Sequence, residues 1–498
     1  MAKVKNPIIW ADVPDPSVIR VEDTYYMSST TMHMNPGVPI MKSRDLVSWE
    51  IVNYVYDVLG EKAEQRLEDG RNEYGKGSWA SSLRYHDGRY YVVFSSQTEN
   101  KTFVFQTRDI EQGPWKKYTL PFVHDMSLLF DDDQRVYLVY GSGDIRLLEL
   151  TEDATALKPG GLDQVIIPDS SAIAGKDIAL PAEGAHIHKI RGMYYIFLIT
   201  WPRGGMRTQL CYRAATITGP WEGRVILEDA GIAQGGLIDT PDGRWYALLF
   251  GDRGAVGRIP YSVPVRWEDG WPILGIMGKV PIDTGLGTRG RLGIVSSDEF
   301  HGSPSSPGLV WQWNHNPDPM YWSLKERPGY LRLRTGRISK DVTQAQNTLT
   351  QRTFGPTCSG EVAIDVSNMK NGDYAGLAAF QRDYGFVGVR MSNHCRYVVM
   401  VDGSSNRCLE VQSIPITQTR LYLKIECDFR DQKDQASFFY SMDDKEWEPI
   451  GHVLQMSYTL PHFMGYRFAL FNFATETTGG FVDFDYFRVT DTGGKEMD

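Results

Sequence analysis

Three carboxylates, Asp15, Asp125 and Glu183, stand at equivalent positions in a pattern that the chain repeats. Each begins a short strand-like stretch, followed by a polar turn and a second, aromatic-rich strand. Carboxylates that share a confined cleft raise one another's pKa, so one can stay protonated while another remains ionised. Such a trio is suited to hydrolysis of a glycosidic bond by a general acid and a general base. A single aspartate in a turn would more often be a cap or a solvated charge, so the equivalence of the three carries the argument.

The repeated pattern occurs five times, with starts 45 to 65 residues apart. An aligned tyrosine follows each start after 11 or 12 positions. The copies begin at Asp15, Trp79, Asp125, Glu183 and Gln234, and their tyrosines are Tyr26, Tyr91, Tyr137, Tyr195 and Tyr246. This period predicts an all-β, five-bladed β-propeller in which equivalent strand starts converge at a central channel. A large β-sandwich with coincidentally similar hairpins is the alternative.

Asp15 lies between Pro14 and Pro16, at the start of the apolar run Ser17 to Val21. Residues that precede proline are pushed toward extended backbone, so Asp15 is expected to be extended and rigidly placed at a strand end. A proline-stiffened turn is the other interpretation of this stretch.

Bulk composition excludes several classes of partner. The net charge of −10, with acidic and basic residues interspersed, argues against nucleic acid and anionic membranes. The five cysteines lack CxxC spacing and are expected to be reduced, mostly buried thiols rather than disulfides or a zinc site. No apolar run approaches the roughly 18 residues of a transmembrane helix, and no signal peptide opens the sequence, so a cytoplasmic protein is expected.

A Ser/Gly/Pro-rich stretch, SSDEFHGSPSSPG from Ser296, predicts a domain boundary. Residues 1–295 are assigned to the propeller and residues 296–498 to a second domain. About ten further strand-like runs in that second part alternate polar and apolar residues without the five-fold repeat. They predict a C-terminal β-sandwich accessory domain.

Several stretches together resemble glycoside hydrolase family 43, the five-bladed-propeller β-xylosidases and α-L-arabinofuranosidases. They are NPIIWADVPDPSVIRV, SWASSL, HDMSLLFDDDQRVYLVY, AEGAHIHKIRGMYYI and GRIPYSVPVRWEDGWPILG. The C-terminal part is similar to the concanavalin A-like domain of β-xylosidases. The resemblance covers nearly the whole chain and implies an inverting, single-displacement hydrolase.

The resemblance also implies a role for each site residue. Asp15 matches the general base, Glu183 the general acid, and Asp125 a third carboxylate that orients the acid and keeps its pKa high. Arg258 matches an arginine that binds sugar hydroxyls, with a propeller-closing ion pair as its alternative. Trp79 matches an aromatic residue of the pocket wall, with a buried core tryptophan as its alternative.

The chain departs from the family pattern at several positions. Residues 79–82, Trp-Ala-Ser-Ser, stand where many β-xylosidases have a WAPD-type motif. Gln234 stands near a histidine that helps hold a hydrated calcium in many members; this puts a structural calcium in doubt, although the amide could still contact water or substrate. His33 is a candidate for the leaving-group side of the rim. His124 and His186 are expected to be supporting or packed residues rather than ligands.

The predicted activity is exo-acting release of terminal α-L-arabinofuranose or β-D-xylose from hemicellulose-derived oligosaccharides. The missing WAPD aspartate leans toward arabinofuranose. No cofactor is required, and a homo-oligomer is left open. The alternatives are an endo-arabinanase, a non-catalytic sugar-binding propeller and a retaining sucrose-type propeller hydrolase, whose Asn-Asp-Pro-Asn, Arg-Asp-Pro and Glu-Cys motifs are absent.

Overall fold

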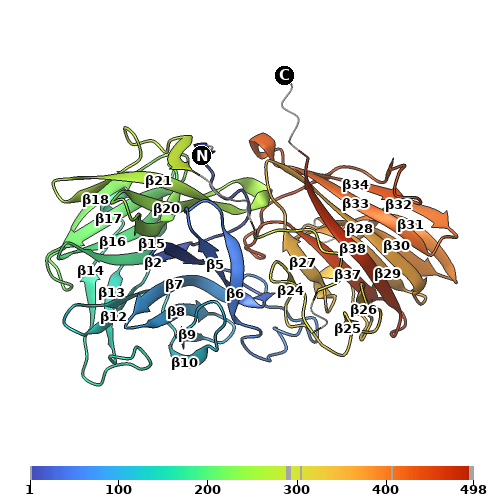
Figure 1. Cartoon of the computed structure of the whole chain (residues 1–498), viewed down its shortest axis with the longest axis horizontal. Coiled ribbons are helices and arrows are strands. Elements are labelled where there is room, and N and C mark those ends of the chain that lie inside the picture. Colours follow the sequence, from blue (N-terminus) through green and yellow to red (C-terminus); the bar gives the residue numbers. More distant parts are fainter. Residues whose placement is uncertain (1–2, 288–292, 303–304, 405–407, 493–498) are drawn as a thin grey trace.

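The computed structural model describes residues 3–287, 293–302, 305–404 and 408–492. Figure 1 shows two β-rich bodies side by side, one in blue to green and one in yellow to red. The helices described are short 3-10 turns: Ala172–Ala174, Gly254–Val256, Val342–Gln344 and Arg430–Gln432. In the part of the chain so described, no helix is long and apolar enough to cross a lipid bilayer.

The first body is a β-propeller of five four-stranded antiparallel blades. Blade 1 contains β2 (Ser17–Val21), β3 (Thr24–Ser28), β5 (Gly37–Ser43) and β6 (Glu50–Tyr56). Blade 2 contains β7 (Ser78–His86), β8 (Arg89–Ser96), β9 (Lys101–Thr107) and β10 (Lys116–Pro121). Blade 3 contains β11 (Ser127–Phe130), β12 (Val136–Tyr140), β13 (Ile145–Leu150) and β14 (Asp163–Ile167). Blade 4 contains β15 (Ile178–Ile190), β16 (Met193–Pro202), β17 (Thr208–Ala214) and β18 (Glu222–Leu227). Blade 5 contains β19 (Ala233–Asp239), β20 (Trp245–Asp252), β21 (Arg258–Glu268) and β22 (Trp271–Leu274).

The five aligned tyrosines confirm the predicted repeat. Each lies on the second strand of its blade and each is buried, in the order Tyr26, Tyr91, Tyr137, Tyr195 and Tyr246. The two-residue alternation of a strand places such a ring between neighbouring blades, where apolar side chains leave water. A two-stranded pairing of β1 (Lys3–Lys5) with β23 (Asp283–Gly287) joins the two ends of this domain.

The innermost strands β2, β7, β11, β15 and β19 form a closed ring in which each contacts the next. Side chains of four blades accept hydrogen bonds from backbone N–H groups of the following blade. The acceptor and donor pairs are Ser17 with Leu83 (2.9 Å), Ser82 with Leu128 (3.0 Å), Ser127 with Ile187 (3.0 Å) and His188 with Leu237 (3.1 Å). These bonds satisfy buried backbone donors that no neighbouring strand could reach, and they fix the relative position of the strand starts.

The second body is a β-sandwich of two sheets. One sheet runs in the order β32 (Leu409–Ile416), β31 (Cys395–Asp402), β30 (Gly385–Ser392), β29 (Asp373–Phe380), β37 (Arg467–Ala474), β27 (Leu349–Arg352), β24 (Gln312–Asn314) and β4 (Met34–Asn35). The other runs β25 (Trp322–Ser323), β26 (Leu331–Arg334), β38 (Phe481–Asp491), β28 (Thr357–Asn368), β33 (Arg420–Asp428), β34 (Gln435–Ser441) and β35 (Glu448–Pro449), with β36 (Leu454–Gln455) also paired to β34. The all-β, propeller-plus-sandwich fold is therefore as predicted. More strands occur than the ten expected, because several span only two to four residues and carry too few positions for an alternating pattern.

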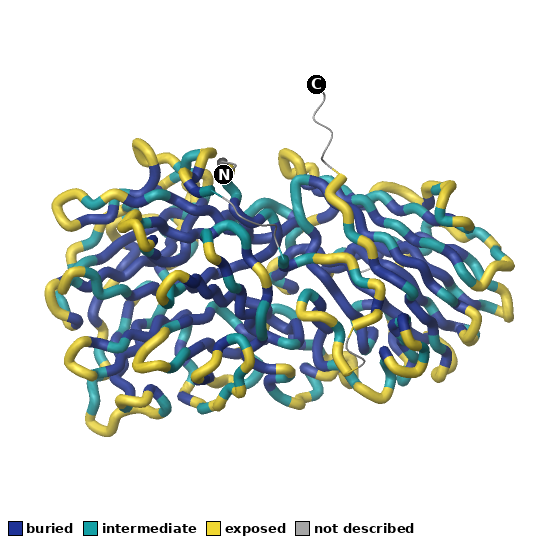
Figure 2. Tube along the Cα trace, viewed as in Figure 1, coloured by how far each residue is buried: buried dark blue, intermediate teal, exposed yellow. Residues whose placement is uncertain are grey.

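The two bodies are joined by shared packing. The short strand β4 comes from the propeller half of the sequence but pairs with β24 of the sandwich. One buried cluster includes Val256 and Ile259 of the propeller together with Tyr466 of the sandwich. Figure 2 shows buried backbone along the strands of both bodies, and exposed segments mainly in their outer loops.

The stretch predicted as a linker is partly integrated into the sandwich. Asp298 and Phe487 exchange two backbone hydrogen bonds of 2.8 Å, which attach this stretch to β38. Residues 303–304 of the same stretch lie outside the described residues. Three of the five free cysteines, Cys211, Cys358 and Cys427, are buried, and the other two are exposed.

Candidate active site

The residues that open the blades adopt unusual backbone conformations. Asp15, Asp125 and Gln234 have φ values of 53°, 45° and 61°, in the left-handed region. The expectation of an extended Asp15 is therefore wrong. Tertiary hydrogen bonds to the backbone override the local effect of Pro16, because the Pro14 carbonyl accepts from the Thr30 amide (3.2 Å) and the Ser29 hydroxyl (2.8 Å). Non-glycine residues with positive φ cluster at functional sites, where surrounding contacts offset the strain.

Asp15 is buried and held at both carboxylate oxygens. The Thr30 hydroxyl donates to its Oδ2 at 2.6 Å, and Arg258 Nη1 lies 3.1 Å from both Oδ1 and Oδ2. A charged donor against a buried carboxylate makes a strong hydrogen bond and fixes its orientation. The geometry therefore suits a base that must point in one direction.

Arg258, the first residue of β21, is 4% exposed yet only partly paired. Its backbone N–H donates to Asp12 Oδ1 at 2.8 Å, while its Nε and Nη2 have no hydrogen-bond partner. The guanidinium lies 4.5 Å from the ring centroid of Phe463, a residue of the sandwich domain. A buried guanidinium with two free donors is available to bind hydroxyl groups of a ligand, because native proteins rarely leave such donors unpaired.

Asp125 and Glu183 form a second group with His124. The Nε2 atom of His124 lies 3.0 Å from Glu183 Oε2 and 3.8 Å from Asp125 Oδ2. Glu183 is partly exposed, while Asp125 is buried. Burial raises the pKa of Asp125 to about 7, and the nearby Glu183 and Asp15 carboxylates act in the same direction. Burial alone would lower the pKa of His124, but its bond to Glu183 and the two carboxylate charges raise it overall.

Aromatic residues of both domains lie beside His124 and Arg258. Trp79, half-buried on β7, donates from Nε1 to the Gly75 carbonyl at 3.1 Å, and its ring meets His124 edge to face with centroids 5.6 Å apart. Phe463 lies 6.5 Å from Trp79, and Tyr458 lies 6.4 Å from Phe463. Burial raises the pKa of Tyr458, so it remains a neutral phenol beside Arg258.

The sequence reasoning did not find the contribution of Phe463 and Tyr458. Both belong to a loop of the sandwich between β36 and β37, far in sequence from the propeller repeats. The repeat signal that located the carboxylates is absent from that domain, so no pattern pointed to these aromatic residues. Arg207 is also close to the site and was not predicted. Burial lowers its pKa, while the charges of Asp15 and Glu183 act in the opposite direction.

The structure does not place His33 at the rim. It is 1% exposed, at the junction of the two domains, with ring centroids 4.8 Å from His462 and 5.0 Å from His315. Burial holds the pKa of all three imidazoles well below the usual value. His33 therefore packs between the domains instead of contacting a ligand.

Gln234 packs behind the acid instead of projecting as a metal ligand. A Cβ added to Gly184 would lie 2.6 Å from its Nε2, so the glycine next to Glu183 leaves the space that this amide fills. The backbone N–H of Gln234 is tied to Gln209 Oε1 at 2.8 Å. His186, as expected, is packed, and burial lowers its pKa to about 3.

The channel residues do not fit a calcium ion. Arg84 extends from blade 2 and donates to the Leu128 carbonyl (2.7 Å), the Ser127 hydroxyl (2.8 Å) and the Ile187 carbonyl (3.0 Å). Burial lowers its pKa to about 10, which leaves it charged at neutral pH. Calcium requires six to eight oxygen ligands, whereas the charged guanidinium of Arg84 would repel a cation beside it.

Among the described residues, one group of side chains lies close enough together to hold a metal ion. The donor atoms of His124, Asp125 and Glu183 lie within 4.8 Å of one another. A cation there would compete with the existing hydrogen bond between His124 and Glu183. The arrangement fits proton transfer better than metal binding, because an acid must keep its proton until the reaction.

Comparison with known proteins shows the family to which the chain belongs. Residues 4–272 match the model of glycosyl hydrolases family 43, and residues 297–490 match the beta xylosidase C-terminal concanavalin A-like domain. A beta-xylosidase of Formosa agariphila is 30% identical over 98% of this chain and 90% of its own length. A non-reducing end alpha-L-arabinofuranosidase of Bacteroides ovatus is 28% identical over 72% of this chain and 70% of its own.

Solved structures show the same architecture. A bifunctional GH43-CE protein of Bacteroides eggerthii is 55% identical and superimposes with a TM-score of 0.96 over 98% of this chain, which spans 64% of the length of that protein. An engineered GH43 glycoside hydrolase with both endo-xylanase and exo-arabinofuranosidase activity is 30% identical, with a TM-score of 0.87 over 98% of this chain. The chain therefore belongs to glycosyl hydrolases family 43 and is a glycosidase.

Proposed function

We propose that the chain is an inverting, exo-acting hydrolase that releases terminal α-L-arabinofuranose, β-D-xylose or both from hemicellulose-derived oligosaccharides. The observation that carries this proposal is the division of the three carboxylates into two environments. Asp15 is clamped by a guanidinium, whereas Asp125 and Glu183 share a pocket region with an imidazole. Different environments give carboxylates different protonation states, as a general base and a general acid require.

In this proposal Asp15 is the general base. It takes a proton from a water molecule that attacks the anomeric carbon, while Arg258 keeps the carboxylate oriented and uses its free donors on sugar hydroxyls. Trp79 supplies an aromatic wall on which a sugar face can stack. Inversion requires the base and acid carboxyl groups to be roughly 6.5–9.5 Å apart, so that the water fits between base and sugar.

Glu183 is the general acid, which protonates the leaving-group oxygen as the glycosidic bond breaks. Its partial exposure gives access to a substrate, and its hydrogen bond to His124 orients the carboxyl group. Exo action is supported by the sandwich residues Phe463 and Tyr458, which place aromatic rings beside Arg258. The names of the relatives support the two sugars, since they include a beta-xylosidase and an arabinofuranosidase.

The experiment compares para-nitrophenyl β-D-xylopyranoside with para-nitrophenyl α-L-arabinofuranoside, using the full chain. We expect turnover of at least one, with proton NMR showing the product first in the opposite anomeric form. Reducing-end-labelled xylo- and arabino-oligosaccharides should lose one sugar at a time from the unlabelled end. Tight sugar binding without turnover of either substrate would contradict the hydrolase proposal, retention would contradict inversion, and internal cleavage would contradict exo action.

A further inference from the structure

The acid of the proposed reaction has one side-chain hydrogen-bond partner among the described residues, and that partner is an imidazole. His124 Nε2 lies 3.0 Å from Glu183 Oε2, whereas the structure gives no direct hydrogen bond between Glu183 and Asp125. No described residue donates to Oε1 of Glu183. The contact that orients Glu183 therefore comes from His124, the residue that precedes Asp125.

We propose that His124 is the positioning residue of the general acid: its Nε2–H holds Oε2 of Glu183 and leaves Oε1 to face the leaving-group oxygen. This inference rests on the proposed function and assigns to His124 the orienting task that the family resemblance gives to Asp125. Asp125 then acts on the imidazole, through the 3.8 Å approach of its Oδ2 to Nε2.

The surroundings of His124 favour a proton on Nε2. Two carboxylate oxygens face that atom, and each is stabilised by an N–H donor. The ring is also held in place, because Trp79 packs against it at an interplanar angle of 71° and the Gly141 amide donates to the His124 carbonyl at 3.0 Å. A ring held at both its edge and its backbone can fix the carboxyl group that it contacts.

The charged groups facing this unit come from several blades. Glu183 of β15 and Asp125 contact the imidazole, and the charges of Asp15 and Arg258 act on it through Asp125. Arg207, between β16 and β17, pairs with Asp252 and is near enough for the charges of Asp15 and Glu183 to act on it. The carboxylates raise the pKa of His124 against the effect of its burial, so a positively charged or strongly polarised donor is maintained toward the acid.

The hydrogen bond strengthens as the reaction proceeds. Glu183 transfers the proton on Oε1 to the glycosidic oxygen, and the bonding electron pair of the breaking carbon–oxygen bond goes to that oxygen. Water, losing its proton to Asp15, forms the new bond to the anomeric carbon. Glu183 ends as a carboxylate, to which Nε2–H donates a charge-assisted bond that is stronger than its bond to the neutral acid.

The test measures kcat/KM of His124→Ala and His124→Gln on aryl glycosides of graded leaving-group pKa. Poor leaving groups need the acid, so His124→Ala should lose on the order of 10²-fold on them and less than about tenfold on a dinitrophenyl glycoside. The glutamine amide can donate to Oε2 and should restore about tenfold of the loss. His124→Ala should also raise the pKa of the alkaline limb of the pH–rate profile, because the lost N–H donor stabilises the carboxylate form of the acid.

Two controls separate the possible outcomes. His394→Ala removes an exposed histidine of the sandwich and should match the wild type on every substrate. Activity of His124→Ala on the dinitrophenyl glycoside reports that the variant is folded. If wild type turns over no glycoside, the proposed function fails; if wild type is active and His124→Ala loses equally on all leaving groups, or glutamine restores nothing, the positioning role is overturned.

Discussion

The two domains each bury an aspartate against arginine, and the two clusters are completed differently. In the sandwich, Asp483 accepts three hydrogen bonds, from Arg332 Nε (2.7 Å), Arg332 Nη2 (2.8 Å) and Arg327 Nη1 (3.0 Å). In the propeller, Asp15 receives a single guanidinium nitrogen of Arg258, shared between its two oxygens at 3.1 Å. The same two residue types thus form a fork in one domain and a single-nitrogen contact in the other.

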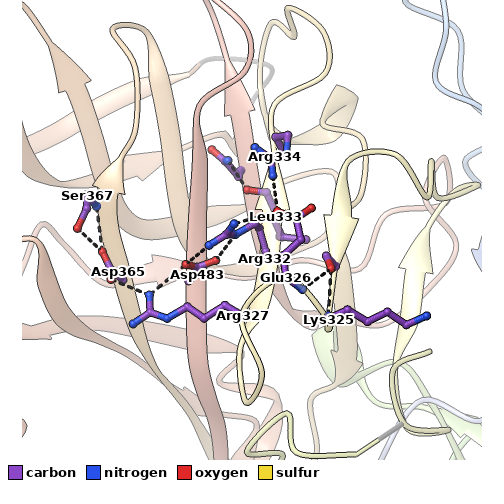
Figure 3. A network of polar contacts seen from close by, with 11 residues as sticks. Lys325, Glu326, Arg327, Arg332, Leu333, Arg334, Asp365, Ser367 and Asp483 are labelled. Carbon is purple, nitrogen blue, oxygen red and sulfur yellow. Dashed lines mark hydrogen bonds and ion pairs between the residues drawn. The ribbon is translucent and has the colours of Figure 1, made fainter. Parts of the chain in front are cut away.

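The sandwich arginines have further partners, as Figure 3 shows. Arg327 also reaches Asp365, which in turn accepts from Ser367, and Arg332 also reaches Glu326. Arg258 instead keeps two nitrogen donors without a partner, in a site that buries them. Unpaired buried donors cost folding free energy, so they persist where a ligand uses them. The comparison suggests that the propeller gives up stability for binding capacity and that the sandwich does not.

The largest effect should come from breaking the Asp15–Arg258 pair of the propeller. Asp15→Asn keeps the shape of the side chain but removes the base, so kcat on aryl glycosides should fall by about 10²–10⁴-fold. Melting temperature and circular dichroism of the variant should show an intact fold. A fall of less than tenfold would exclude Asp15 as the base and would reduce the Asp15–Arg258 pair to a structural contact.

Breaking the Asp483 cluster of the sandwich should instead lower stability and leave activity unchanged. Asp483→Ala removes a carboxylate whose side chain is 3% exposed and leaves Arg332 largely buried without its main partner. Loss of one member of a buried ion pair costs about 3–5 kcal/mol of unfolding free energy. Urea denaturation should show this loss, while kcat at 25 °C stays within twofold of wild type. A large fall in kcat with unchanged stability would mean that the sandwich network serves the active site.

The sequence predicts the positions of the propeller carboxylates better than the contacts between the two domains. The positions of Asp15, Asp125 and Glu183 follow from a strand–turn–strand pattern that recurs five times, because each repeat is one blade and equivalent blade positions converge. The buried tyrosines of the second strands follow from the same register. The fold class could therefore be predicted, including the sandwich, whose longer strands keep a clear two-residue alternation.

Features that depend on contacts between domains could not be predicted. Phe463 reaches the pocket from a sandwich loop, and His33 is buried by His315 and His462 rather than facing a ligand. Neither contact has a local pattern, because it depends on how two separately patterned domains pack. The left-handed backbone of Asp15 was missed for a similar reason: the Thr30 and Arg258 contacts that hold it come from 15 and 243 residues away.

A smaller effect should distinguish the two domains through the pH dependence of the unfolding free energy. The folded-state pKa of Asp125 is raised by burial to about 7, against 3.8 for an ordinary aspartate. Between these values the unfolded chain releases a proton that the folded chain keeps, so the unfolding free energy falls as pH rises. Asp125→Asn removes this term and should gain roughly 3 kcal/mol relative to wild type between pH 4.5 and 7.

The sandwich supplies the control for this pH experiment. The pKa of Asp365 is shifted downward: burial would raise it, but the hydrogen bonds from Ser367 and Arg327 outweigh that effect. Its contribution is lost only below the ordinary aspartate pKa, so the difference between Asp365→Asn and wild type should be constant from pH 4.5 to 7. Urea denaturation at both pH values measures each difference. A constant difference for Asp125→Asn would mean that the Asp125 carboxyl is already ionised in the folded protein at low pH.

The smallest expected effect concerns the guanidinium of Arg84, for which no carboxylate partner occurs among the described residues. Arg84 binds the Leu128 and Ile187 carbonyls and the Ser127 hydroxyl, on the innermost strands of blades 3 and 4. Because this internal cation already satisfies those oxygens, dialysis against EDTA should change neither kcat/KM nor the melting temperature. Added calcium should restore nothing, since nothing is lost. Arg84→Met should lower the melting temperature, because it leaves the Leu128 and Ile187 carbonyls without a donor. Loss of activity in EDTA with recovery on calcium would show that the channel binds a metal ion despite Arg84, and would remove the guanidinium from that role.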